Sequence, residues 1–218
     1  AVCHSHRQES NEERAALQRA LELNPRHPWA CFNMGTSELK ARRYDSALQW
    51  YKSAVELDPE NDMAREQLIN LHIRFGQIER AKDLLPGFSC PAQQAFMSGK
   101  IHLAAGARTS AKRCLREALR HAPGFLDAWR KLATLAEQQG EDKAAARAWQ
   151  RLLELHPFDR HALKALTTNH LRNGHFRKAY RLLENIVFDS ELDFIRARAA
   201  VQLGWRHRAL DALDDVLL

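Results

Sequence analysis

The chain has few residues that break helices, and it has no long apolar segment. Its 218 residues include 9 glycines and 7 prolines, while alanine, leucine, arginine and glutamate dominate. This composition argues against a sheet protein with many tight turns and predicts an all-α chain of stacked helices. No apolar run approaches the ~20 residues that cross a bilayer. The first residues, AVCHSHRQESNEER, lack the apolar centre of a signal peptide.

Paired cysteines are absent as well. Four cysteines are spread along the chain and form no CxxC pair. This argues against a zinc site or a dense disulfide framework and favours a reducing compartment such as the cytoplasm. We expect Cys31 and Cys114 to be small core residues, Cys90 to be an incidental loop thiol, and the terminal Cys3-His4-Ser5-His6 to be a ragged chain end rather than an adventitious metal site.

Signatures of catalysis are also lacking. The sequence contains no GxGxxG, GxxxxGK[ST], HExxH or GxSxG motif, and its carboxylates are scattered. We therefore expect no enzyme activity and no cofactor. The formal net charge of +6 and the pI near 9.4 favour acidic partners over basic ones.

A repeat of about 34 residues organises the chain. Pro25 and Pro59 lie 34 residues apart, as do Pro123 and Pro157, and each ends a similar run: ALELNP, AVELDP, ALRHAP and LLELHP. Alanines follow the same spacing, with steps of 34, 30, 34, 34 and 30 residues, at Ala47, Ala81, Ala111, Ala145, Ala179 and Ala209. Small residues at these places predict close crossings of two helices. Glycines shortly before several of them predict left-handed turns between the helices of a pair.

These features resemble the tetratricopeptide repeat family over nearly the whole chain. One unit carries Trp129, Leu132, Ala133, Ala145, Trp149 and Pro157 at the family's large, small and proline positions, and another carries Met34, Gly35, Ala47, Tyr51, Ala54 and Pro59. The resemblance implies an all-α, right-handed superhelical solenoid of antiparallel helix pairs, with about six full repeats after a partial one. The expected repeats are 1–27 (partial), 28–61, 62–91 (shortened), 92–125, 126–159, 160–189 (shortened) and 190–218.

The chain departs from the family at several places. Histidines His72, His102 and His170 replace the usual first-helix tyrosine, and we expect them to pack between helices rather than bind metal. Cys31, Arg65, Ala95, Leu163 and Asp193 stand where the family has tryptophan. The last unit has no polar capping helix, so we expect Val216, Leu217 and Leu218 to be covered by further chain or by self-association.

Two connections are shortened. In DLLPGFSCP, residues 83–91, we expect the helix to stop at Leu85 because Pro86 cannot donate an intrahelical hydrogen bond. A second contraction falls at residues 186–191, and the pattern of prolines, glycines and alanines recurs after 98 residues. Either a duplicated three-unit block or two independent deletions explains this recurrence. We expect local irregularities of the helix stacking at both places.

The resemblance implies that first helices line a concave, basic surface for a partner. Residues three to four apart on these helices share one face. The expected partner-binding residues are Trp29, Phe32, Asn33, Thr36, Lys40, Asn70, Arg74, Phe96, Met97, Lys100, Arg130, Lys131, Thr134, His161, Lys164, Thr168, Arg172, Phe194 and Arg198. Such a surface suits a peptide or protein with acidic groups and a few apolar anchors.

Three functions remain open at this point. The first is a non-catalytic protein-binding scaffold that recruits or assembles other proteins. The second is binding of single-stranded RNA, because helical-hairpin repeats of similar length read RNA; the proline-ended units favour protein binding instead. The third is a recruitment segment of a larger enzyme, since the sequence lacks an initial Met and we expect a processed form or a fragment.

Overall fold

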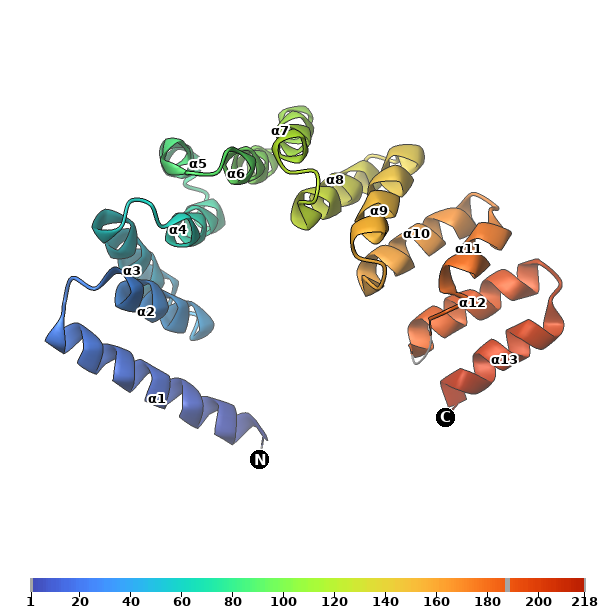
Figure 1. Ribbon diagram of the computed structural model, residues 1–218, viewed down its shortest axis with the longest axis horizontal. Helices are drawn as coiled ribbons and strands as arrows, with labels where there is room; N and C mark the ends of the chain where they lie inside the picture. Colours follow the sequence, from blue (N-terminus) through green and yellow to red (C-terminus); the bar gives the residue numbers. More distant parts are fainter. Residues whose placement is uncertain (1, 187–188, 218) are drawn as a thin grey trace. The chain divides into compact units, whose positions relative to one another are not determined.

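The computed structural model describes the backbone of residues 2–186 and 189–217, and the side chains of residues 12, 14–186 and 189–213. Thirteen α-helices and one short 3₁₀ helix account for the regular structure of these residues, and no strand occurs among them (Figure 1). The prediction of an all-α chain is therefore confirmed. The helices form two compact units, Ala1–His121 and Ala122–Leu218.

Unit 1 contains the first seven helices. Their bounds are α1 (Val2–Leu23), α2 (Pro28–Lys40), α3 (Tyr44–Leu57), α4 (Asp62–Arg74), α5 (Ile78–Asp83), the 3₁₀ helix η1 (Leu85–Gly87), α6 (Pro91–Ala104) and α7 (Arg108–His121). Helix α2 packs on α3, α4 on α5, and α6 on α7. Each first helix is thus followed by a partner that returns against it.

Unit 2 continues the same arrangement. Its helices are α8 (Leu126–Gln138), α9 (Asp142–Leu155), α10 (Arg160–Arg172), α11 (Phe176–Leu183), α12 (Ser190–Gln202) and α13 (Arg206–Leu217). Helix α8 packs on α9, α10 on α11, and α12 on α13. The pairs are linked because α10 also contacts α9, and α12 also contacts α11.

The turns within the pairs depend on left-handed backbone. Gly76, Gly106, Gly140, Gly174 and Gly204 have φ between 68° and 75°, which residues with a Cβ rarely adopt. Arg42 has φ 59° in the α2–α3 turn, where the sequence has no glycine. The prediction of helix-terminating glycines is confirmed, and Arg42 takes the same conformation at a steric cost.

Close helix crossings explain the repeated alanines. Ala47, Ala81, Ala111, Ala145 and Ala179 are completely buried, and Ala209 is 5% exposed. Small residues on the first helices meet the second helices in the same way: a Cβ added to Gly35 would lie 2.9 Å from the ring of Tyr51. The predicted close contacts are therefore present in both units.

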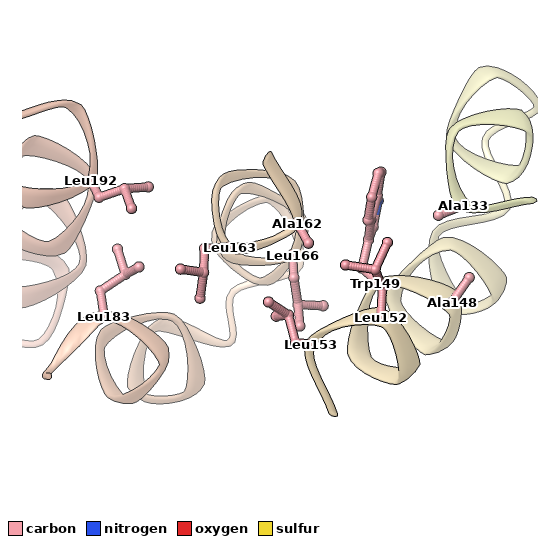
Figure 2. Packing of buried hydrophobic residues seen from close by; sticks show 10 residues of the cluster. All are labelled: Ala133, Ala148, Trp149, Leu152, Leu153, Ala162, Leu163, Leu166, Leu183 and Leu192. Carbon is pink, nitrogen blue, oxygen red and sulfur yellow. The ribbon is translucent and has the colours of Figure 1, made fainter. Parts of the chain in front are cut away.

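The core of unit 2 runs between successive helices. Trp149 and Leu152 of α9 lie beside Ala162 and Leu166 of α10, while Leu163 faces toward Leu183 and Leu192 (Figure 2). This shared apolar layer joins the helix pairs into one body, since burying each such side chain contributes about 1.5–3 kcal/mol.

The two contracted regions change the helices themselves. Helix α5 has 6 residues and α11 has 8, whereas α3, α7 and α9 have 14 each. Helix α5 ends at Asp83, two residues before the predicted stop at Leu85, and Leu85, Pro86 and Gly87 form η1. The prediction placed the contraction in the connection; the structure places most of it in the second helix. Residues 187–188 and the side chains of Cys3, His4, His6, Val216, Leu217 and Leu218 lie outside the described part.

Candidate partner-binding surface

Four of the expected binding residues lie together on α10 and line one pocket. His161, Lys164, Thr168 and Arg172 follow one another at intervals of three or four residues and line one pocket of about 420 Å³. Its other lining residues are Glu137, Gln138, Asp142, Ala165 and Asn169. We call these nine residues the α10 surface. It is contributed by the end of α8, the start of α9 and one face of α10, all within unit 2.

The start of α10 is fixed by Asp159. Its carboxylate accepts a hydrogen bond from the Ala162 amide at 2.8 Å and one from the Arg130 guanidinium at 2.7 Å. Burial opposes ionisation of Asp159, but these two interactions outweigh it and lower the pKa of the carboxyl group. An N-terminal carboxylate also stabilises the helix. Arg130 is therefore a structural link between α8 and α10 as well as an expected binding residue.

One wall of the α10 surface is held by aromatic and amide contacts. The His161 and Trp149 rings meet in a T-shaped arrangement with centroids 5.3 Å apart, and Trp149 Nε1 donates to Glu137 Oε1 at 2.8 Å. Asn169 Nδ2 donates to the Asp142 carbonyl at 3.2 Å. These bonds fix the helices that form the pocket, so its shape is set before any partner arrives.

The positive charge of the expected surface is partly neutralised. Lys164 pairs with Glu191, which also accepts from Arg160 at 3.0 Å, and the hydrogen bond from Lys164 is the main cause that lowers the Glu191 pKa. In unit 1, Lys100 donates to Asn70 at 2.6 Å and lies 3.7 Å from Glu66. The sequence predicts a basic surface, but it could not indicate these contacts, whose partners lie 27 or more residues apart in sequence.

Some cations remain available. Lys131, Arg172 and Arg198 are exposed. None of them makes an ion pair with any side chain that the structure describes. Lys131 and Arg198 lie on α8 and α12, outside the pocket, with Phe194 also exposed on α12. Thr134 turns its hydroxyl back to the Arg130 carbonyl at 2.9 Å.

The expected residues on α2 form a separate aromatic group. Trp29 stacks on Phe32 with centroids 5.3 Å apart, and Phe32 lies 5.7 Å from the Tyr51 ring. Thr36 lies 3.1 Å from the Tyr51 hydroxyl. Trp29 is 50% exposed and Phe32 is partly buried, whereas Tyr51 is completely buried, so the outer aromatics of this group are the ones open to a partner. Asn33 is partly buried and Lys40 is exposed on the same helix.

Two expected binding residues belong to the core. Phe96 is 5% exposed and Met97 is completely buried, because this part of α6 packs against its neighbours. Neither side chain is open to a partner, and we leave both out of the proposed surface. On α4, Arg74 lies over the Tyr44 ring with its guanidinium carbon 4.0 Å from the centroid.

The structure adds residues that the sequence pattern did not indicate. Gln138 and Asp142 join the α10 surface because the α8–α9 turn brings them beside α10, and Asn169 joins it from α10 itself. Phe158, in the connection to α10, is 74% exposed. A helical spacing pattern identifies residues on one helix, but it does not identify those that a turn brings in from another.

Two histidines and two thiols of the described residues pack against other side chains. His72 is buried and its Nδ1 lies 2.7 Å from Gln77 Oε1, while the His170 ring meets His175 edge-on. Cys31 and Cys114 are buried, as predicted, and burial raises the Cys31 pKa. Among the described residues, no three His, Cys, Asp or Glu side chains are placed to hold a metal ion. No helix in the same part of the chain is long and apolar enough to cross a membrane.

Family models identify these repeats. Two models described as tetratricopeptide repeat match residues 38–86 and 96–160, which together are more than half of the chain. The chain belongs to the tetratricopeptide repeat family. Its fold is an all-α helical repeat solenoid, and repeats of this family support a scaffold that binds other proteins. The family is generally non-catalytic.

Several solved structures share this fold at low sequence identity. A tetratricopeptide repeat protein from Parabacteroides merdae is 15% identical, with TM-score 0.59, over 98% of this chain and 94% of that one. The APC/C hetero-tetramer Cut9–Hcn1 gives TM-score 0.62 at 16% identity, over 97% of this chain and 40% of that one. The human IFIT1 dimer with m7Gppp-AAAA gives 0.63 at 16% identity, over 95% and 54%.

One curated relative is similar in sequence. Cellulose synthase operon protein C of Pseudomonas fluorescens is 26% identical over 178 residues, which are 82% of this chain. The matched part is 12% of the relative. The chain therefore corresponds to a small segment of that longer protein.

Proposed function

We propose that this tetratricopeptide repeat scaffold binds an extended peptide segment of another protein at the α10 surface. The observation that supports this most is the pocket of about 420 Å³ along His161, Lys164, Thr168 and Arg172. Its volume lies in the range of pockets that hold small ligands or side chains, about 300–1,000 Å³. The pocket is preformed, so a partner does not have to order it on binding.

The chemistry of the α10 surface favours a segment with a carboxylate. Arg172 is exposed and has no ion pair with a described side chain, so its guanidinium is free to bind a carboxylate in a bidentate manner, through two parallel hydrogen bonds. Lys164 is already paired with Glu191, and a partner's acid would share or replace that pair. Thr168 lies between the two cations and offers a hydroxyl to the partner's backbone.

Charge reversal tests this proposal. Full-length protein carrying Lys164→Glu and Arg172→Glu should lose specific partners in quantitative affinity-capture mass spectrometry. The matched control is Arg113→Glu with Arg116→Glu, two exposed residues of α7 with the same change of charge. Loss confined to the α10 variant supports the proposal. An identical set of captured proteins from both variants would overturn it.

The name of the sequence relative indicates where to look for a partner first. Cellulose synthase operon protein C is named for a cellulose synthase operon, and its matched segment aligns with 82% of this chain. Proteins of such a system are the first candidates for capture. Whether this chain serves as the recruitment segment of a larger enzyme is tested by the same capture on the full-length protein.

The RNA alternative makes a different prediction. One structure with this fold was solved with m7Gppp-AAAA. If the function were RNA binding, a gel shift with single-stranded RNA should show affinity that falls steeply with salt, because phosphate contacts release counterions. We expect no such binding, since Lys100, Arg130 and Lys164 are already paired with carboxylates.

A further inference from the structure

A second pocket lies on the opposite face of α10. Gln150, Leu166, His170, Lys178, Arg181 and Leu182 line a space of about 420 Å³ between α9, α10 and α11; we call it the α11 pocket. Leu166 and His170 are roughly half a helical turn away from the stripe of His161, Lys164, Thr168 and Arg172, given 3.6 residues per turn. The α11 pocket is therefore separate from the α10 surface.

The α11 pocket has a counterpart in unit 1. A pocket of about 550 Å³ between α3, α4 and α5, the α5 pocket, includes six residues that precede the α11 lining residues by 98 positions. They are Lys52, Leu68, His72, Arg80, Asp83 and Leu84. In both units the pocket lies where a shortened second helix ends, since Leu84 follows α5 directly and Leu182 is in the last turn of α11. This recurrence ties the pockets to the shortened helices.

The charges of the two pockets differ. Asp83 and Glu56 line the α5 pocket, where Lys52 lies 3.8 Å from Glu56 and Arg80 donates to Gln77 at 3.4 Å. The α11 pocket has no carboxylate in its lining. Arg181 occupies the place of Asp83.

The cations of the α11 pocket are available to a ligand. Lys178 and Arg181 are exposed, and neither makes an ion pair among the described side chains. Leu166 and Leu182 provide an apolar floor beside these cations.

We propose that the α11 pocket is a second docking site, which binds a segment of a partner protein carrying a leucine-sized side chain next to an Asp or Glu. The apolar side chain would rest on Leu166 and Leu182, and the carboxylate would lie between Lys178 and Arg181. Charge complementarity selects this occupant, because a pocket that is positive and half apolar disfavours a basic or wholly polar segment.

His170 provides an internal reporter of this site. Burial lowers its pKa first, and the positive charges of His175 and Lys178 lower it further. Arg181 lines the same pocket, and Asp142 and Lys143 of α9 line an adjoining space of about 130 Å³ that shares His170 and Lys178. A bound carboxylate opposes the surrounding positive charge, so it should raise the pKa of His170.

The probe is an acetylated Leu-Glu-Leu-Glu peptide amide, added to the full-length isotope-labelled protein and followed by NMR. We expect shifts of the NMR signals of His170 and Lys178 and a rise of the His170 pKa. The Arg181→Asp variant should bind the peptide at least about tenfold more weakly, because it loses one ion pair and gains a repulsion. Arg177→Asp, an exposed change on the same helix outside the pocket, is the matched control and should bind normally.

Several results would overturn the proposal. One is that Arg181→Asp and Arg177→Asp bind the peptide equally well. Another is that a Leu-Gln-Leu-Gln peptide binds as well as Leu-Glu-Leu-Glu. The third is that the His170 signal does not shift with the peptide at about 5 mM, a concentration above the dissociation constant of a weak specific site. In the variant with Lys164→Glu and Arg172→Glu, the peptide-induced shifts at His170 and Lys178 should persist. Failure of the α10 surface and failure of the α11 pocket are thus distinguishable.

Discussion

The connections after α5 and after α11 occupy corresponding places 98 residues apart, yet different interactions hold them. After α5, the buried Arg65 of α4 donates to Asp62 at 3.0 Å and to the Pro59 carbonyl, and lies 5.6 Å from the Phe88 ring. Asp62 accepts from the Ser89 hydroxyl at 2.6 Å. A buried cation thus fastens the connection to the preceding helix.

After α11, the ion pair between the connection and the preceding helix lies at the surface. The exposed Arg160 of α10 pairs with Asp189, which also accepts from the Glu191 and Leu192 amides at the start of α12. Arg196 donates to the Ile186 carbonyl at 3.3 Å. Asp62 and Arg160 hold corresponding positions with opposite charge, so the same shortened geometry is compatible with two chemistries. The difference should appear in stability, because buried ion pairs cannot be replaced by water.

Removal of the two arginines should give the largest contrast. Arg65→Ala should lower the free energy of unfolding by about 3 kcal/mol, because it leaves the Pro59 carbonyl and Asp62 without their buried partner. Arg160→Ala should cost less than about 1 kcal/mol, since its pair is exposed. Urea unfolding followed by circular dichroism measures both. Equal losses would show that the buried and exposed connections do not differ as described.

A smaller effect is expected at Gly87. A Cβ at this position would lie 2.5 Å from Arg65 Nε, so Gly87→Ala should destabilise the protein by about 1–2 kcal/mol through overpacking. Gly124→Ala is the control, because a Cβ there meets nothing within 4 Å. In an Arg65→Ala background, Gly87→Ala should be nearly neutral. A full loss in that background would contradict the role given to Arg65.

The smallest expected effect is the loss at low pH of the stabilisation that the Arg160–Asp189 pair provides. The hydrogen bond from Arg160 is the main cause that lowers the pKa of Asp189, below its ordinary value of 3.8. A lowered pKa in the folded state means that the stabilisation is fully present above about pH 5 and is lost as pH falls through the folded pKa. The difference in urea midpoint between the natural protein and Arg160→Gln should therefore shrink as pH falls from 7 to 3. If the difference in urea midpoint stays constant or grows on acidification, the Arg160–Asp189 pair is not its source.

Features that repeat could be predicted from the sequence. The turn glycines and crossing alanines were correct because each makes the same local demand in every unit. Helical spacing also placed His161, Lys164, Thr168 and Arg172 together. The same spacing failed for Phe96 and Met97, because it does not tell which side of α6 packs inward.

Contacts between different helices could not be predicted in this way. The pairing of Lys164 with Glu191 joins residues 27 positions apart, and nothing in the spacing indicates it. From the sequence, Arg65 was identified only as a replacement for a tryptophan. Its contacts with the connection after α5 depend on Gly87, which leaves room for the Arg65 guanidinium. The α11 pocket was missed because it exists where a helix ends early, and the sequence pattern placed the contraction in the connection.

The most direct test of this account exchanges the charges of the two pockets. A variant with Asp83→Arg and Arg181→Asp should move binding of the Leu-Glu-Leu-Glu peptide from the α11 pocket to the α5 pocket. NMR shifts should then appear at His72 and disappear at His170, since these residues hold corresponding places in the two linings. Shifts that stay at His170 after the exchange would contradict the claim that charge at the end of each shortened helix decides which pocket binds.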